Sequence, residues 1–345
     1  SLRRIPGRPD DRHRLLPLGE RHAFVYTVHH SVSEFLFSPV WKPTDTEVGG
    51  GQIGAAIYIW GSILTCAVAL VIAIPFSLST AIFMEQISPK IGKVIRPAVE
   101  IFVGIPSVVY GWVGLVVLVP LIQKVFDRSH GQSVLAAAIV LSVMIYPTIT
   151  SVSADAIRSV NQKYIEGAYG LGSTRWQMIY KVLLPAAMSG ILTAIVLGLA
   201  RAFGEALAVS MVIGKMRAFP KSLLDPTNNL TSAIASDMGG AMDGGEFNAA
   251  LWSMALLLFI VSLLFILIIH LIAARKEKID EPEFFPFGGE LRHVSGSLKR
   301  AHMSDHLATA VFYVVSGAFV LLLIAFTMYV VWGGIKAFRP EIFLF

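Results

Sequence analysis

Long apolar runs without charge constrain this chain more than any other feature. Residues 53–84 carry no charged side chain, and the next charge is Glu85. A helix needs about 20 residues to cross a hydrocarbon core about 30 Å thick, so this run can span a membrane. Five more predominantly apolar runs follow, at 98–122, 133–152, 187–213, 249–273 and 307–332. The sequence therefore predicts an all-α, polytopic transmembrane helix bundle with about six spans.

Composition and charge agree with this class. Of the 345 residues, 55% are hydrophobic and 15% charged, which is too apolar for a soluble fold to cover with polar surface. The formal charge of +5 does not indicate nucleic acid, because Lys and Arg lie between the apolar runs and form no continuous basic face. Membrane lipid is expected to surround the chain. By the positive-inside rule, three basic segments are expected to be cytoplasmic: 85–97, 158–181 and 275–278.

The apolar runs also divide the chain into parts. The region after the fifth run contains Pro282, Pro286 and Gly288, which are typical of a linker. We expect a basic N-terminal segment that is interfacial or extracytoplasmic, a transmembrane core with a cytoplasmic loop at its middle, a polar linker, and an extra transmembrane helix with a short tail. These parts cover residues 1–52, 53–275 with the loop at 155–185, 276–306 and 307–345.

The loop between the third and fourth spans has the character of a docking element. Residues 164–185 are too polar to cross a membrane and too long for a tight turn, and Gly170 and Gly172 break their helical pattern. A short helix, a glycine turn and a second helix would project one face from the membrane. Glu166 and Arg175 would then be available to a partner protein.

This loop resembles that of the permease subunits of ABC importers, whose motif reads Glu-Ala-Ala, three residues, Gly, nine residues, Ile, one residue, Leu-Pro. Gly167 replaces the first Ala and Val182 replaces Ile. The resemblance implies a MetI-like fold and a loop that seats in a cleft of an ATPase and transmits its closure to the channel. An ordinary amphipathic loop helix is the alternative. The coupling positions are Glu166, Gly167, Ala168, Gly172, Leu184 and Pro185.

Two opposite charges lie within the fourth apolar run. Arg201 and Glu205 are four residues apart, which places them on one face of a helix where they can pair. A charge near the bilayer centre costs about 2.5 to 3.5 kcal/mol, so both side chains are expected to face protein or a wet cavity. The fork of a guanidinium matches an oxyanion such as phosphate, and Glu205 would hold that fork. A purely structural ion pair is the alternative.

The same stretch resembles the phosphate-specific permeases of the PstC type, which carry a Gly-Leu-Gly-Arg-Ala-Leu-Gly-Glu-like segment after the loop motif. Ala200 and Phe203 are the variant positions here. Other similar segments are 35–41, 82–85 and 104–111, and the resemblance covers about residues 32–275. In that family the Arg and Glu of this segment are associated with phosphate passage, which implies this role for Arg201 and Glu205.

Small and polar residues interrupt the second apolar run. The segment 104–111 contains Ser107 and Tyr110 between glycines and a proline. Such a segment suits a helix that bends beside a solute pathway, and close packing of helices explains it equally well. We therefore place Ser107 and Tyr110 among the candidate pathway residues.

The motifs for other chemistry are missing from the sequence. No Gly-x-x-x-x-Gly-Lys-Ser/Thr loop occurs, so the chain is expected to be non-catalytic and to bind no cofactor directly, with ATP and Mg²⁺ held by a separate ATPase. Cys66 is the single cysteine, which excludes an intrachain disulfide and a thiolate metal cluster. The histidines at 22, 29 and 30 lack an acidic or thiolate cluster at ligand spacing, so no metal site is predicted.

The last apolar run departs from the family pattern, which places a helix before the 35–41 region. The ending at 337–345 resembles the start of the companion permease of the PstA type, after its own first span. Two interpretations stay open. The chain is either a shortened fusion of two permease halves, or the late helix replaces an early one.

The resemblance implies one half of an inward phosphate channel in a bacterial plasma or inner membrane. The expected partners are a PstA-type companion permease, a dimer of PstB-type ATPase subunits, a PstS-type phosphate-binding protein and phosphate itself, with no nucleic acid. A permease for molybdate, sulfate or an organic nutrient is the first alternative, because the loop motif is shared across importers. A membrane scaffold that docks a soluble partner without conducting a solute is the second.

Overall fold

The structure is a computed structural model of the whole chain. It describes residues 32–43, 51–241, 246–279, 308–322, 324–325 and 328. The described part is almost entirely helical, which confirms the predicted all-α class. The exceptions are two short strands that pair antiparallel, with Trp41 opposite Ile53.

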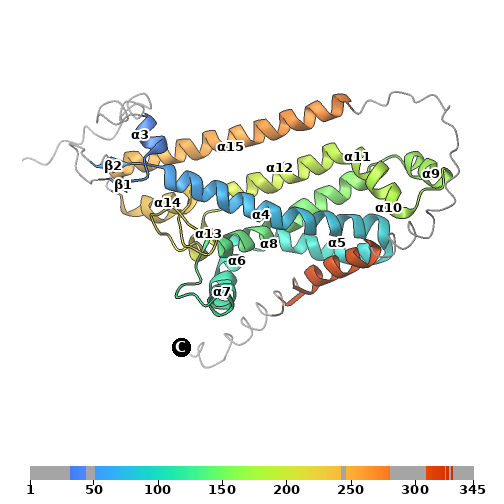
Figure 1. Cartoon of the computed structure of the whole chain (residues 1–345), viewed down its shortest axis with the longest axis horizontal. Helices are drawn as coiled ribbons and strands as arrows, with labels where there is room; N and C mark the ends of the chain where they lie inside the picture. The colour runs from blue at the N-terminus through green and yellow to red at the C-terminus, as the bar shows by residue number, and fades with distance from the viewer. Residues whose placement is uncertain are drawn as a thin grey trace, which may run out of the picture.

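The helices form an elongated bundle, with α4, α8, α12 and α15 along its length and α9 and α10 at one end (Figure 1). The first half contains α3 (Val32–Phe37), β1 (Trp41–Lys42), β2 (Gln52–Ile53), α4 (Ala56–Ile82), α5 (Pro89–Val103), α6 (Ser107–Val113), α7 (Val119–Phe126) and α8 (Val134–Arg158). The second half contains α9 (Gln162–Gly170), α10 (Arg175–Met178), α11 (Leu184–Ala186), α12 (Met188–Gly204), α13 (Leu207–Val212), α14 (Leu230–Asp237) and α15 (Glu246–Ile279). Three π-helical turns, Phe83–Ile87, Gly114–Leu118 and Ile179–Leu183, and a 3-10 turn, Met238–Gly240, lie between these helices.

Helix α8 is the centre of the bundle. It packs mainly against α4 and α12, and most of its apolar side chains are fully buried. Two polar contacts tie it to α4: the Ser77 hydroxyl donates to the Tyr146 carbonyl at 3.2 Å, and the Tyr146 hydroxyl donates to Thr80 Oγ1 at 2.9 Å. Such interhelical hydrogen bonds satisfy polar groups that lipid cannot satisfy, so they hold α8 in place against α4.

Small residues let other helices approach α8 closely. A Cβ at Gly198 would lie 2.6 Å from Cγ1 of Ile149, so α12 packs on α8 at a distance that only glycine allows. Gly198 thus admits the neighbouring helix α8. This approach also brings Arg201, one turn further along α12, beside α8.

By length and apolarity, three described helical stretches can cross a membrane: 56–87, 107–126 and 134–158. A fourth is possible if the pair Arg175–Ala186 and Met188–Gly204, bent by 69°, counts as one broken span. Two of the six expected spans are interrupted. The run 98–122 is broken after Val103, and its span begins at Ser107. Within the run 187–213, α12 ends at Gly204 and α13 begins at Leu207. Segments 250–264 and 308–322 are shorter apolar helices within the described residues.

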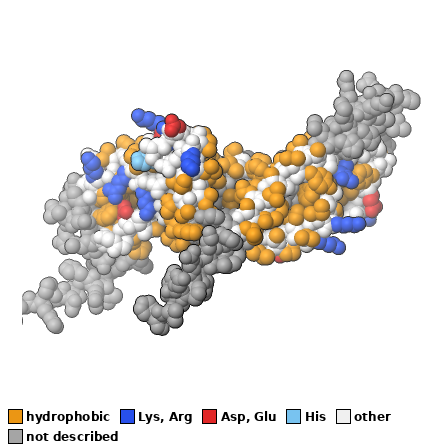
Figure 2. All heavy atoms as spheres, turned by 90° about the horizontal axis from the view of Figure 1, so that it is seen from below, with side chains coloured by type: hydrophobic (Ala, Val, Ile, Leu, Met, Phe, Trp, Pro, Cys, Tyr) orange, Lys and Arg blue, Asp and Glu red, His pale blue; other side chains and the backbone are white. Residues whose placement is uncertain are grey.

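Charge is distributed as a membrane protein requires. On the face shown in Figure 2, hydrophobic side chains cover the middle of the molecule, and charged side chains gather toward its two ends. Apolar residues on α15, among them Phe259 and Leu263, are also exposed. Because lipid is the only solvent that favours such a surface, the fold is that of a multi-pass membrane protein.

The described residues bear on the predicted parts only in places. Helix α15 continues to Ile279, into the first residues of the predicted linker. The remainder of the predicted linker, most of the N-terminal segment and the ending at 337–345 lie outside the described residues. The last helix, Ala308–Leu322, packs on the bundle: the rings of Phe319 and Tyr146 are 3.8 Å apart, and those of Phe312 and Trp176 are 5.4 Å apart.

Candidate functional site

Arg201 contacts oxygen atoms of two neighbouring helices. Its Nη1 donates to Thr148 Oγ1 on α8 at 3.0 Å, and its Nη2 approaches the carbonyl oxygen of Val103 on α5 at 3.5 Å. Both acceptors are neutral, and among the described residues no carboxylate lies within ion-pair distance of this guanidinium. Arg201 therefore has no ion-pair partner among the described residues.

The end of α5 helps to hold this charge in place. Val103 is the last residue of α5, and the final carbonyls of a helix lack intrahelical partners. They also form the negative end of the helix dipole, which favours a nearby cation by about 0.3 to 1 kcal/mol. Pro106 and Gly104 explain why α5 stops there, since proline disfavours the helical conformation of the residue before it. Because α5 ends at this point, a carbonyl oxygen is left that Arg201 can contact.

Glu205 does not pair with Arg201, and this part of the prediction is wrong. The two lie four residues apart, but α12 ends at Gly204 and Glu205 has an extended backbone, with ψ of 117°. Its Oε1 instead accepts a hydrogen bond from the amide of Ala208 at 2.9 Å, at the start of α13. Its backbone carbonyl accepts one from the Thr231 hydroxyl at 2.9 Å. Glu205 therefore caps the next helix, because the helical spacing assumed for the pair is interrupted.

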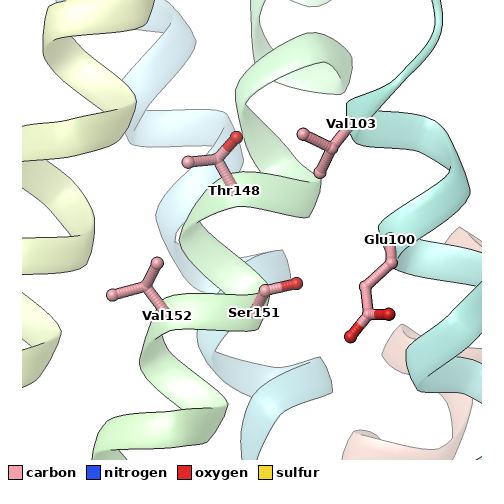
Figure 3. Close-up of a pocket in the computed structure, with 5 residues that line it drawn as sticks. All are labelled: Glu100, Val103, Thr148, Ser151 and Val152. Atoms are coloured by element: carbon pink, nitrogen blue, oxygen red, sulfur yellow. The ribbon is translucent and has the colours of Figure 1, made fainter.

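A pocket of about 340 Å³ lies between α5 and α8, next to the contacts of Arg201 (Figure 3). The two oxygens that Arg201 approaches belong to residues of its wall, so the guanidinium lies at its edge. The hydroxyl oxygen of Ser151 is buried and has no hydrogen-bond partner among the described residues. The pocket is lined by Glu100, Val103, Thr148, Ser151 and Val152.

The other two predicted pathway residues lie where α5 turns into α6. Tyr110 is buried, with 2% of its surface exposed, and its hydroxyl donates to the carbonyl of Phe102 at 2.8 Å. This bond ties the two sides of the turn together. Ser107 is half-buried at the first residue of α6. Neither residue lines the pocket, so their part in solute passage stays a prediction.

Sequence reasoning missed Glu100, Thr148 and Ser151. Thr148 and Ser151 are three residues apart on α8, which puts them on one helical face, and a single carboxylate in an otherwise apolar run marks Glu100. Both signals are readable in the sequence. What the sequence does not give is the pairing of α5 with α8, which brings the three side chains to one pocket.

The predicted coupling residues lie at one end of the bundle, on α9, a glycine turn, and α10 to α11. Glu166 and Gly167 are exposed on α9, while Ala168 is buried. Gly172 has φ of +78°, a conformation that favours glycine, and the Thr174 and Gln177 side chains form a capping box that starts α10. The predicted order of helix, glycine turn and helix agrees with the structure.

The outer surface of these helices is apolar as well as charged. Tyr164, Tyr169 and Leu171 are 53%, 45% and 76% exposed. The inner side is anchored: Ala168 belongs to a buried cluster with Met178 on α10 and Ile157 on α8. A rigid, apolar and protruding surface of this kind is suited to docking another protein.

An ion network lies beside this anchored end. Arg96 of α5 donates to Glu85 and to Asp155 of α8, at 2.7 Å in both cases, and Arg158 donates to both oxygens of Glu85 at 3.0 Å. Burial acts to lower the pKa of Arg96, but its hydrogen bonds to Asp155 and Glu85 outweigh that effect and raise the pKa above its usual value. The network locks α5 and α8 together at the end where the coupling helices are.

The fold, the central arginine and the projecting helices define a transport permease. The chain belongs to the family described as "Binding-protein-dependent transport system inner membrane component", whose sequence model matches residues 73–278. It is 50% identical over 245 residues to "Probable ABC transporter permease protein YqgH" of Bacillus subtilis, covering 71% of this chain and 78% of that protein. It is 34% identical over 264 residues to "Phosphate transport system permease protein PstC" of Haemophilus influenzae, covering 71% and 82%.

These comparisons confirm the predicted resemblance to permeases of the PstC type and the importer-permease class of the fold. Among solved structures, the MetNI methionine ABC transporter in inward facing conformations aligns with a TM-score of 0.49 at 20% identity, over 63% of this chain and 93% of that one. Family membership also implies an ATPase and a solute-binding protein as partners.

Proposed function

We propose that this chain is one half of the channel of a phosphate importer. The observation that carries the proposal is the guanidinium of Arg201, which lies beside a pocket between α5 and α8 and has no ion-pair partner among the described residues. A permanent positive charge with forked donors attracts and orients a tetrahedral oxyanion. The relatives that are named phosphate transport permeases support phosphate as that anion.

The chain works with separate subunits in this proposal. It holds no ATP or metal itself, and a dimer of ATPase subunits with ATP and Mg²⁺ drives the cycle. The exposed surface of α9 and the glycine turn, with Glu166 and Gly172, would seat in that ATPase. A companion permease would complete the channel, and a phosphate-binding protein would deliver the anion on the outer face of a bacterial plasma or inner membrane.

ATP-driven uptake of labelled phosphate by the complete complex in proteoliposomes tests the proposal. The intact complex is expected to accumulate phosphate, and Arg201→Gln is expected to lower the rate at least about tenfold, since a hydrogen bond to a charged group contributes about 1.5 to 3 kcal/mol. Arg217→Gln is the matched control, because that arginine is 48% exposed and pairs with Asp237 at 3.2 Å.

Two results would contradict the proposal. Undiminished uptake by a normally assembled Arg201→Gln complex would remove this residue from the mechanism. Uptake of molybdate, sulfate or an organic nutrient by the intact complex, with none of phosphate, would replace the solute while keeping the class of transporter.

A further inference from the structure

The last helix, Ala308–Leu322, turns one face toward the bundle. Phe312, Ser316 and Phe319 are four and three residues apart in the sequence, which places them on one side of a helix. Ser316 and Phe319 are buried and Phe312 is half-buried, whereas Leu321 is 67% exposed. The side chains of this face therefore decide how the helix packs on the bundle.

Aromatic rings hold the last helix against α8 and α4. The ring centroid of Phe319 lies 3.8 Å from that of Tyr146 on α8 and 5.3 Å from that of Phe76 on α4. The Tyr313 ring meets that of Phe83, in the π-helical turn that follows α4, edge to face at 4.9 Å. Aromatic pairs stabilise a contact beyond the burial of their surface. The helix is thus held at two places on the long helices.

A further contact joins the last helix to α10. The Phe312 ring lies 5.4 Å from the ring of Trp176, the second residue of α10. Helix α10 has only four residues, and so short a helix depends on packing for its stability. Phe312 and Trp176 also pack on the buried cluster that contains Met178 of α10. The position of α10 therefore depends in part on a helix from a distant part of the sequence.

We propose that the last helix holds α10 in position against α4 and α8, and that Phe312 is the positioning residue through which it does so. The inference rests on the proposed function, in which the helices at this end seat in a separate ATPase. A helix that contacts α10 through Phe312 and α8 through Phe319 joins this end to the middle of the bundle. Loss of the Phe312 ring is expected to loosen α10 while Phe319 keeps the last helix in place.

The ratio of phosphate taken up to ATP hydrolysed, measured with the complete complex in proteoliposomes, tests the inference. Phe312→Ala is expected to lower this ratio about three- to tenfold, because one aromatic pair is lost, with normal assembly of the complex. Phe312→Tyr keeps a ring and is expected to keep the ratio. Leu321→Ala is the matched control, because it shortens an exposed side chain of the same helix. A purely structural role would lower uptake and hydrolysis together and leave the ratio unchanged.

A reversible link between the two contacting residues gives a second test. The double variant Phe312→Cys with Trp176→Cys lacks both rings, so its ratio is expected to fall at least as far as that of Phe312→Ala. A short bis-methanethiosulfonate reagent that joins the two thiols is expected to raise the ratio again at least about threefold, and reduction is expected to reverse the gain. Phe312→Cys alone with the same reagent is the control, and the buried Cys66 is kept in both variants.

Hydrogen exchange of the amides at 174–178 gives a readout that involves no solute. In the purified complex, Phe312→Ala is expected to speed exchange there about three- to tenfold, because α10 opens more often. Exchange in α14, at the other end of the bundle (Figure 1), is expected to stay unchanged.

Four results would overturn the inference. They are an unchanged ratio in Phe312→Ala, an equal fall of the ratio in Leu321→Ala, a thiol link that restores nothing, or unchanged hydrogen exchange in α10. The exchange measurement separates this failure from that of the proposed function. If the intact complex takes up no phosphate but exchange in α10 responds to Phe312→Ala, the proposed function fails and the positioning of α10 stands.

Discussion

Arg96 and Arg201 both reach α8, but in opposite electrostatic surroundings. Arg96 lies between two carboxylates, Glu85 and Asp155, each at 2.7 Å. Arg201 approaches only a hydroxyl, at 3.0 Å, and a carbonyl, at 3.5 Å. A paired charge that is partly buried serves to hold helices together, whereas an unpaired one is expensive to keep unless it serves a ligand.

The difference separates two tasks along one helix. At the end near α9 and α10, α8 is joined to α5 by an ion pair, which holds the two helices together there. Further along, the same two helices line a pocket beside a guanidinium that has no ion-pair partner among the described residues. The comparison predicts a structural task for the first region and, under the proposed function, solute handling for the second, and four substitutions test this division.

The largest effect is expected from Arg201→Met. Phosphate uptake by the complete complex should fall at least about 100-fold, because the anion loses a bidentate charged contact worth about 3 kcal/mol. Thermal stability of the chain in detergent should not fall, since no carboxylate loses its partner. A large drop in the unfolding temperature would show that Arg201 is a structural residue, as Arg96 is.

Glu85→Gln should instead lower the stability of the chain. Glu85 is 11% exposed and receives hydrogen bonds from both Arg96 and Arg158. Loss of its charge should destabilise the chain by about 2 to 3 kcal/mol, below the range for fully buried pairs because Arg158 is 59% exposed. Denaturant unfolding measures this, with Asp237→Asn, in a more exposed pair, costing under about 1 kcal/mol. Equal losses of stability in Glu85→Gln and Asp237→Asn would show that the network stabilises the chain no more than the more exposed ion pair does.

Thr148→Val should give a smaller and selective effect. Valine has the same shape as threonine but cannot accept the hydrogen bond from Arg201, so the guanidinium loses one of its two contacts. Uptake is expected to fall about fivefold with little change in stability. Thr193→Val is the control, because that hydroxyl is exposed and donates only to Ser189 of its own helix. Identical uptake in the two variants would show that Thr148 does not position Arg201.

Glu205→Gln should have the smallest effect. A glutamine carbonyl can accept the hydrogen bond from the amide of Ala208 as the carboxylate does. Uptake is expected to stay within about twofold, whereas Glu205→Ala should cost about 1 kcal/mol of stability through loss of the cap. A loss with Glu205→Gln comparable to that of Arg201→Met would support the ion pair that this structure lacks.

The sequence alone identified the class of the protein because its signals are local. Twenty-residue apolar runs need no knowledge of neighbours, since the bilayer imposes the length. The spacing from Glu166 through Gly172 to Pro185 likewise predicted two helices around a glycine turn, and the positive φ of Gly172 shows why glycine is there. Arg201 stood out for the same reason, as a charge in an apolar run.

Tertiary structure decided what those residues do. Whether Arg201 meets Glu205 depends on where α12 ends, and this is set by the packing of α13 and α14 around Glu205, which no helical spacing reveals. Likewise Glu100 and Ser151 are about fifty residues apart and meet only because α5 packs on α8. The sequence determined which charges enter the membrane, and the packing of helices determined which of them are paired and which are not.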